Sequence, residues 1–323
     1  MKAIVFTRYG SPDGLELKEV PKPTPKADEL LVRVRASSVN SWDWEFLNGK
    51  PFVNRLMFGL VKPKAGKQIL GADIAGTVEA VGKRVTRFKP GDNVFGDLWD
   101  KWGGFAEYAC ARESAMEAKP GNATFEQSAA IPQAGVLALQ GLRKAGQLQP
   151  GQKVLINGAG GGVGTLAIQL AKLDGAEVTG VDAAHKLSVV RSVGADHIID
   201  YAETDFTQTG DRYDLIVDCQ NFRSITDLKR ALKPGGTYAM IGGSRVLPVL
   251  IQRLIGPLAG ESRRFHVVAN GPNKGLAELG ALVDSGRLAP HIDSTCQLSE
   301  VPEALRYFGQ GRHAGKIAIT VKR

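Results

Sequence analysis

The chain has 323 residues, a formal net charge of +8 and 23% charged residues, values typical of a soluble globular protein with room for two domains. Its basic residues are spread along the chain and form no basic block interleaved with aromatic residues, so we expect no nucleic-acid partner. No apolar run approaches the roughly 20 residues that cross a bilayer, and the N-terminus has no signal-peptide pattern, so we expect a cytoplasmic protein with no membrane partner.

Short strands separated by glycine and proline turns fill the region before Thr124. Prolines at positions 12, 21, 23, 25 and 90 mark several of the breaks. This spacing predicts an irregular, partly closed, β-barrel-like domain over residues 1–123. Its strands are expected at residues 1–6, 15–20, 29–36, 74–81, 92–95 and 105–111.

From Thr124 the pattern changes to helices alternating with apolar strands, which predicts parallel strands buried on both faces. The fold class is therefore α/β, with a doubly wound parallel sheet of the Rossmann type over residues 124–262. Residues 263–323 are expected to return to the first domain. The strands of the α/β region are expected at residues 153–157, 177–182, 197–201, 213–219 and 237–242, and the last segment holds a strand at 264–269, a helix at 274–287 and a strand at 316–321.

The strongest functional signal is KVLINGAGGGVGTLAIQLAK, a run from Lys153 to Lys172 in which a glycine-rich turn joins an apolar strand to a helix. In this context Gly161 and Gly162 let the backbone approach a pyrophosphate, and Gly164 lets the helix pack closely on the strand. The helix N-terminus adds free N–H groups and a positive dipole end. Ala159 stands where the usual motif has its first glycine. The pattern predicts a dinucleotide-binding turn.

Asp182 ends the second strand of the predicted parallel sheet. An acid there accepts hydrogen bonds from the adenosine ribose and repels a 2′-phosphate, which favours NADH. His185 and Lys186 stand close by in the sequence and could attract that phosphate instead, which favours NADPH.

With this turn in place, the chain resembles the medium-chain dehydrogenase/reductase superfamily, and within it the quinone oxidoreductase (zeta-crystallin-like) branch. The similarity covers nearly the whole length. It implies a GroES-like N-terminal domain, a Rossmann domain, a cleft between them for nicotinamide and substrate, and a homodimer. The supporting motifs occur in family order and are VRASSVNSWD (Val34 to Asp43), GADIAGTVEAVG (Gly71 to Gly82), KPGDNVFG (Lys89 to Gly96), GGFAEY (Gly103 to Tyr108), GADHIIDY (Gly194 to Tyr201) and HAGKIAI (His313 to Ile319).

The resemblance also implies site residues by their positions in these motifs. Asn40 would lie near the nicotinamide end, and Asn40 and Asp43 are the candidates for holding geometry near the reacting atoms, with a structural role favoured for Asp43. The remaining cofactor contacts are implied at Gly161, Gly162 and Val163 for the pyrophosphate, at Asp182 and Lys186 for the adenosine ribose, at Tyr201 for the adenosine side, at Gly242 and Gly243 for the nicotinamide, and at Lys316.

No zinc site is expected. Zinc-dependent relatives place a Cys in the segment that matches residues 38–40 and a His-Glu pair where Asp73 and Ile74 stand here. The three cysteines of this chain, Cys110, Cys219 and Cys296, are far apart and form no CxxC pair.

The predicted activity is hydride transfer from a reduced nicotinamide to a quinone, or to the β-carbon of an enone or enal, without zinc. NADPH is preferred because the family branch prefers it, and NADH stays open because of Asp182. One alternative is an NAD-dependent secondary alcohol dehydrogenase, which would need a group that stabilises an alkoxide. Another is a non-catalytic NAD(P)H-binding redox sensor. Trp42, Trp44 and Trp99 either wall an aromatic pocket or belong to the core.

Overall fold

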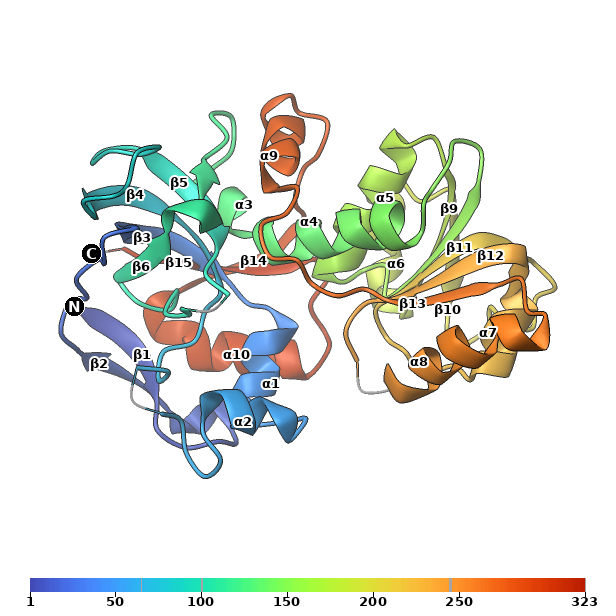
Figure 1. Cartoon of the computed structure of the whole chain (residues 1–323), viewed down its shortest axis with the longest axis horizontal. Helices are drawn as coiled ribbons and strands as arrows, with labels where there is room; N and C mark the ends of the chain where they lie inside the picture. Colours follow the sequence, from blue (N-terminus) through green and yellow to red (C-terminus); the bar gives the residue numbers. More distant parts are fainter. Residues whose placement is uncertain (65, 100, 244–245, 323) are drawn as a thin grey trace. The chain divides into compact units, whose positions relative to one another are not determined.

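The computed structural model has two compact units, one built from residues Met1–Gln133 and Pro272–Arg323 and the other from Ala134–Gly271. It describes residues 1–64, 66–99, 101–243 and 246–322. The first unit therefore combines the blue and red ends of the chain in Figure 1, and the second holds the green to orange middle.

A seven-stranded, mainly antiparallel sheet forms the first unit, with strand order β14-β15-β3-β4-β5-β7 and with β6 paired to β3 (Glu29–Ser38). Residues 29–33 of β3 pair with β6 and residues 36–38 pair with β15, so two neighbours share one edge of this strand and the sheet curls on itself. β1 and β2 form a separate antiparallel pair. The other strands are β1 (Lys2–Phe6), β2 (Leu15–Glu19), β4 (Asp73–Val81), β5 (Asn93–Asp97), β6 (Tyr108–Arg112), β7 (Glu117–Ala118), β14 (Ile292–Gln297) and β15 (Lys316–Thr320).

Two helices follow β3: α1 (Ser41–Asn48), which the sequence patterns did not predict, and α2 (Val53–Phe58), in a stretch for which either a loop or a helix was expected. A buried aromatic cluster anchors them to the core. The rings of Phe46 and Phe58 stack with centroids 4.0 Å apart, and both meet the Trp102 ring edge-on. The other helices of this unit are α3 (Phe125–Ala129), α9 (Leu276–Asp284) and α10 (Val301–Gly309), with 3₁₀ turns at Pro12–Gly14, Glu113–Ala115 and Leu298–Glu300.

A six-stranded, all-parallel sheet forms the second unit, with strand order β10-β9-β8-β11-β12-β13. Its central strands are almost completely buried, as expected for a sheet covered by helices on both faces. The strands are β8 (Lys153–Asn157), β9 (Glu177–Asp182), β10 (His197–Asp200), β11 (Tyr213–Asp218), β12 (Leu232–Met240) and β13 (Arg264–Val267). The helices are α4 (Pro132–Leu139), which begins at the end of the first unit, a π-helical turn Gln140–Ala145, α5 (Gly162–Leu173), α6 (Leu187–Ser192), α7 (Ile225–Ala231) and α8 (Val246–Ile255), with 3₁₀ turns at Ala184–Lys186 and Pro257–Ala259.

The α/β class, with a doubly wound parallel sheet and a separate β-rich domain, is confirmed, but the units divide at other residues than we predicted. Residues 124–133 belong to the first unit, where Thr320 of β15 donates a hydrogen bond to Glu126 of α3. β13, which we assigned to the returning C-terminal segment, instead pairs with β12 in the parallel sheet. By pairing with β12, β13 satisfies the backbone N–H and C=O groups that β12 would otherwise leave unpaired on that side.

The two phenylalanines of the α2 region give a matched test of this packing. Phe58 is 1% exposed and Phe52 is 64% exposed. Phe58→Ala should lower the free energy of unfolding by about 3–5 kcal/mol, because it leaves a cavity in the aromatic cluster. Phe52→Ala should change it by no more than about 0.5 kcal/mol. Denaturant titration of both variants measures the difference, and equal losses would contradict the observed packing of α2.

Candidate functional site

The glycine-rich turn lies at the carboxyl end of β8, a central strand of the parallel sheet. The N–H groups of Gly158 and Ala159 donate to the Val181 carbonyl at 2.9 and 3.1 Å, which ties the turn to β9. α5 begins at Gly162, and its N-cap residue Gly161 has no side chain to cap the helix. The first N–H groups of α5 are therefore available to an anion, as at other dinucleotide-binding turns.

Two glycines of this turn differ in what surrounds them. A Cβ on Gly164 would lie 2.3 Å from the Gly158 carbonyl oxygen and 2.6 Å from the Ala159 Cα, so this position cannot carry a side chain without moving the backbone. A Cβ on Gly161 would meet only the Gly158 carbonyl oxygen, at 3.4 Å. Gly164 thus permits the close packing of helix and turn, and Gly161 has room for a methyl group.

The end of β9 brings an acid and a lysine to the same turn. The Asp182 carboxylate accepts hydrogen bonds from the N–H groups of Gly160 and Ala183, at 2.8 and 2.9 Å. The buried Lys186 has its Nζ 3.9 Å from Asp182 Oδ1, too far for a direct hydrogen bond. The N–H of Tyr201 donates to the Asp182 carbonyl at 3.2 Å, and the tyrosine ring is exposed. Three residues implied by the resemblance, Asp182, Lys186 and Tyr201, therefore lie together near the carboxyl end of β9.

A buried network that we did not predict lies where β8, β11 and β12 end. Asp218 accepts hydrogen bonds from Asn157 Nδ2 at 2.8 Å, from the N–H of Asn221 at 2.9 Å and from the Tyr238 hydroxyl at 3.0 Å. Burial and the neighbouring Asp218 carboxylate raise the pKa of Tyr238, so its hydroxyl stays a donor. The sequence signal was available, because Asn157 and Asp218 are the polar last residues of two apolar strands.

This network reaches the predicted nicotinamide glycines. Asn221 Nδ2 donates to the Gly242 carbonyl at 3.2 Å, and a Cβ on Gly243 would lie 2.4 Å from the same nitrogen. Both glycines have positive φ, +67° and +85°, which few other residues adopt. The backbone after β12 is therefore shaped by contacts at the carboxyl ends of three strands.

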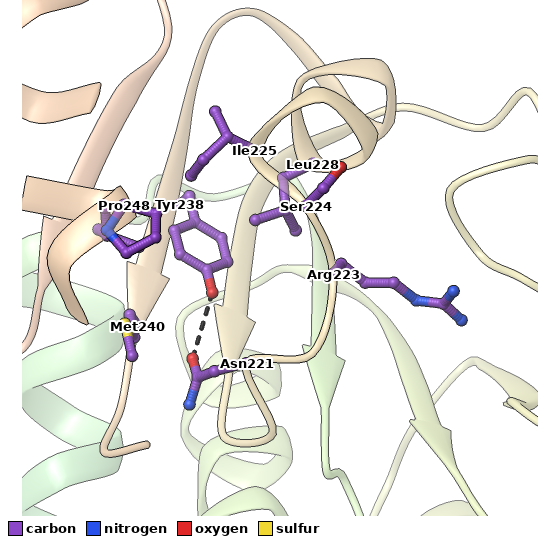
Figure 2. A pocket seen from close by; sticks show the side chains of 9 residues that line it. Asn221, Arg223, Ser224, Ile225, Leu228, Tyr238, Met240 and Pro248 are labelled. Atoms are coloured by element: carbon purple, nitrogen blue, oxygen red, sulfur yellow. Dashed lines mark hydrogen bonds between the residues drawn. The ribbon is translucent and has the colours of Figure 1, made fainter. Parts of the chain in front are cut away.

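A cavity of about 180 Å³ adjoins the network (Figure 2). Tyr238 and Asn221 lie in its wall, joined by a hydrogen bond of 3.2 Å between the Tyr238 hydroxyl and Asn221 Oδ1. None of the residues implied as cofactor contacts lines this cavity, so it is separate from the glycine-rich turn. The rest of the wall comes from the loop before α7 and from α7, β12 and α8, through Arg223, Ser224, Ile225, Leu228, Met240, Pro248 and Val249.

In the first unit, Asn40 and Asp43 form the start of α1. Asn40 is its N-cap, and its N–H donates to Asp43 Oδ2 at 2.8 Å. The other oxygen of Asp43 accepts the N–H of Gly71 at 2.8 Å. Asp43 is completely buried, and this burial raises the pKa of its carboxyl to about 7. Asp43 therefore has a structural role, since its carboxyl group joins the backbone of Asn40 to that of Gly71.

Asp73 and Lys316 complete this buried cluster. The Lys316 ammonium donates to Asn40 Oδ1 at 2.5 Å and to the Val39 carbonyl at 3.0 Å, and lies 3.7 Å from Asp73 Oδ2. Asn40 Nδ2 donates to the same carboxylate oxygen at 3.0 Å. Burial raises the pKa of Asp73, whereas the ammonium lowers it. Asp73 was not among the predicted site residues.

The three tryptophans whose roles were left open are all partly exposed. The rings of Trp42 and Trp99 lie 3.8 Å apart at 45°. Trp44 packs on α10, where a Cβ on Gly309 would lie 2.3 Å from its ring. Trp42 and Trp44 both pack against the core of the first unit, so burial does not assign one role to each tryptophan.

The residues at the zinc positions of related enzymes do not fit a metal ion. An ammonium group, that of Lys316, lies among Asn40, Val39 and Asp73. Within residues 1–64, 66–99, 101–243 and 246–322, no group of three or more His, Cys, Asp or Glu side chains is arranged to hold a metal. A buried cation beside the Asp73 carboxylate opposes the binding of a second cation there.

A parallel sheet with a glycine-rich turn, an uncapped helix N-terminus and an acid-lysine pair at the same edge is the arrangement of dinucleotide-binding domains of the Rossmann type. Comparison with known proteins agrees. Residues 26–141 match the alcohol dehydrogenase GroES-like domain, and residues 193–319 match the family model called zinc-binding dehydrogenase.

Similar proteins cover the whole chain. A 2-methylene-furan-3-one reductase of Solanum lycopersicum is 34% identical over 99% of this chain and 79% of its own length. An NADPH-dependent alkenal/one oxidoreductase, chloroplastic, of Arabidopsis thaliana is 30% identical over the same shares. The structure of the quinone oxidoreductase from Coxiella burnetii superposes with a TM-score of 0.88 at 31% identity, covering 100% of this chain and 99% of the other.

The chain therefore belongs to the medium-chain dehydrogenase/reductase superfamily, in its zinc-independent quinone oxidoreductase branch. The relatives named above are reductases and oxidoreductases, and this chain is an oxidoreductase of the same branch.

The two glycines of the turn separate folding from binding. Gly164→Ala should lower the free energy of unfolding by about 1–3 kcal/mol, because its methyl group overlaps the turn backbone. Gly161→Ala should leave stability within about 0.5 kcal/mol of the parent and weaken nucleotide binding, because its methyl group occupies the face offered to the pyrophosphate. Thermal denaturation and nucleotide titration measure the two effects. Unchanged binding by Gly161→Ala would show that the nucleotide does not approach this face.

Proposed function

We propose that the chain is an NADPH-dependent reductase of quinones and α,β-unsaturated carbonyl compounds. The observation that carries the proposal is the glycine-rich turn with the buried Lys186 beside it. When bound, the nicotinamide would supply a hydride, and the residues of the chain bind, orient and stabilise charge.

In this proposal, Gly161, Gly162 and Val163 bind the pyrophosphate through the uncapped start of α5. Asp182 already holds two N–H groups of the turn and its neighbour, so much of its hydrogen-bonding capacity supports the turn. Lys186 has no direct hydrogen bond to that acid, and its ammonium is available to a 2′-phosphate. This balance favours NADPH over NADH. Tyr201, exposed at the same edge, is proposed to lie along the adenosine.

Hydride transfer to the β-carbon of an enone, or two-electron reduction of a quinone, leaves negative charge on a carbonyl oxygen of the substrate until a proton arrives. We propose that the Asn40 amide donates a hydrogen bond to that oxygen, with Gly242 and Gly243 beside the nicotinamide. Trp42 and Trp99 supply an aromatic surface suited to a planar substrate.

A secondary alcohol dehydrogenase is disfavoured because the residues at the zinc positions do not fit a metal that would hold the alkoxide. The redox-sensor alternative is set aside because the similar proteins named above are enzymes.

We also propose a homodimer formed through the second unit. β13 ends the order of the parallel sheet, and α8 exposes Leu247 and Leu254 at 67% and 73%. Sedimentation equilibrium tests this proposal by measuring whether the mass in solution is that of one chain or of two.

The cytoplasmic location stays a prediction. Among the helices in the described part of the chain, none is long and apolar enough to cross a membrane.

Turnover tests the activity. Added 9,10-phenanthrenequinone or a 2-alkenal should oxidise NADPH in the presence of the protein, seen as loss of reduced-nicotinamide absorbance. Asn40→Ala should lower kcat about 10²-fold, the usual effect of removing one donor to a developing oxyanion. Asn54→Ala is the control, because Asn54 is another amide of the same unit, whose Nδ2 donates to the Lys50 carbonyl at 3.1 Å and which is not proposed to contact the substrate. Binding of NADPH without oxidation by either substrate class would contradict the proposal.

Removal of one charge tests the cofactor preference. Lys186→Met should weaken NADPH binding about 10- to 100-fold and leave NADH binding unchanged, since a charge-assisted hydrogen bond contributes about 1.5–3 kcal/mol. Lys172→Met is the matched control, because Lys172 pairs with Asp196 2.7 Å away on the same unit. Equal weakening of both nucleotides by Lys186→Met would show that the lysine supports the turn and not the 2′-phosphate.

A further inference from the structure

The Asn40 side chain is held between opposite charges. Its Oδ1 accepts a hydrogen bond from the Lys316 ammonium, and its Nδ2 donates one to the Asp73 carboxylate. All three residues are buried, with exposed fractions of 5%, 3% and 0% for Asn40, Lys316 and Asp73. Asn40 is therefore fixed by two charge-assisted hydrogen bonds in a medium where such bonds are strong.

The sheet register brings these distant residues together. Ser38, at the end of β3, lies opposite Asp73 on one side and opposite Ala318 on the other. Lys316 is two residues before Ala318, so it shares a sheet face with Ser38 and Asp73. Asn40 follows β3 directly as the N-cap of α1.

The charges allow only one orientation of the amide. If it rotated by half a turn, the NH₂ group would face the Lys316 ammonium and the carbonyl oxygen would face the Asp73 carboxylate. Both contacts would be repulsive. The amide carries two N–H groups, and one of them is used by Asp73. The second N–H is left as the donor that the side chain can offer to a ligand.

We propose that Lys316 is a positioning residue, which together with Asp73 locks the Asn40 amide so that it presents a hydrogen-bond donor to the carbonyl oxygen of a quinone or enone. This inference rests on the proposed function of Asn40 and names what makes that function possible. In this proposal Lys316 does not touch the ligand, because its ammonium is buried, donates to the Val39 carbonyl and to Asn40, and lies 3.7 Å from Asp73.

A charge-neutral pair of substitutions separates positioning from stability. Lys316→Met alone leaves a buried carboxylate unpaired and should lower both stability and kcat, the latter about tenfold or more, as expected when a reacting geometry is displaced. Asp73→Asn with Lys316→Met removes both charges, so stability should recover toward that of the parent. The amide is then free to rotate, and kcat should stay low. Recovery of kcat together with the denaturation midpoint would overturn the proposal, because a purely structural pair would behave in that way.

A double-mutant cycle tests whether Lys316 acts through Asn40. In the Asn40→Ala background, Lys316→Met should cause little further loss of kcat, since no amide remains to be oriented. Losses that multiply would overturn the proposal. Lys316→Arg keeps the cation and its N–H groups and should restore most of the kcat that Lys316→Met loses.

Control measurements separate the proposed function from the positioning of Asn40. Lys101→Met breaks another ion pair of the same unit, in which a partly exposed lysine lies 2.7 Å from the buried Glu29, and should lower stability without changing kcat. If the parent protein oxidised NADPH with neither substrate class, the proposed function would fail and the inference with it. If the parent turned over and Asn40→Ala did not change kcat, only the role of Asn40 and its positioning would fail.

Discussion

One buried ammonium group among three buried carboxyl groups sets the geometry of the first unit. Lys316 lies against Asp73, and Asp43 and Asp97 are buried nearby. Burial, reinforced by the Asp73 carboxylate, raises the pKa of Asp97 to about 7, so these acids cannot all ionise without cost near neutral pH. The lysine is 276 residues from Asn40 in the sequence, and its contact ties the last strand to the beginning of α1. The end of the chain is therefore part of the site that its beginning forms.

In the second unit, close backbone contacts and hydrogen bonds to the backbone shape the candidate site, whereas buried charged side chains do so in the first unit. Gly164 allows α5 to lie against the turn, and Asp182 holds the N–H of Gly160. These contacts shape a surface of N–H groups before any ligand binds, which lowers the cost of ordering it. Asp218 has a similar function at the end of β11, where it accepts hydrogen bonds from Asn157, Asn221 and Tyr238. The polar ends of parallel strands thus shape the edge of the sheet where we propose that the nucleotide binds.

Local patterns predicted most of the fold. β8 and β9 begin and end where the apolar runs predicted, because strands buried on both faces leave a clear signal. α1 was missed although Asn40 and Asp43 have the spacing of a capping box, since its length of eight residues gives little periodicity. β13 was assigned to the wrong unit because a four-residue strand does not reveal its neighbours.

The candidate site can be read from the sequence where a motif is continuous, but not where it depends on contacts between distant residues. The residues of the glycine-rich turn follow from one run of sequence. The partnership of Asp73 with Lys316 depends on sheet register, and no local pattern contains it. Lys316 was predicted as a cofactor contact from its motif alone, and its burial against Asn40 now favours a positioning role.

Transfer of the hydride is the central claim, and an isotope label follows it most directly. NADPH carrying deuterium on the reactive carbon of the nicotinamide is incubated with the protein and a 2-alkenal, and the product is analysed by mass spectrometry and NMR. The account predicts that deuterium appears at the β-carbon of the saturated aldehyde and that the α-carbon takes its hydrogen from solvent. Saturated product without the label, or label found at the carbonyl carbon of an alcohol, would contradict it.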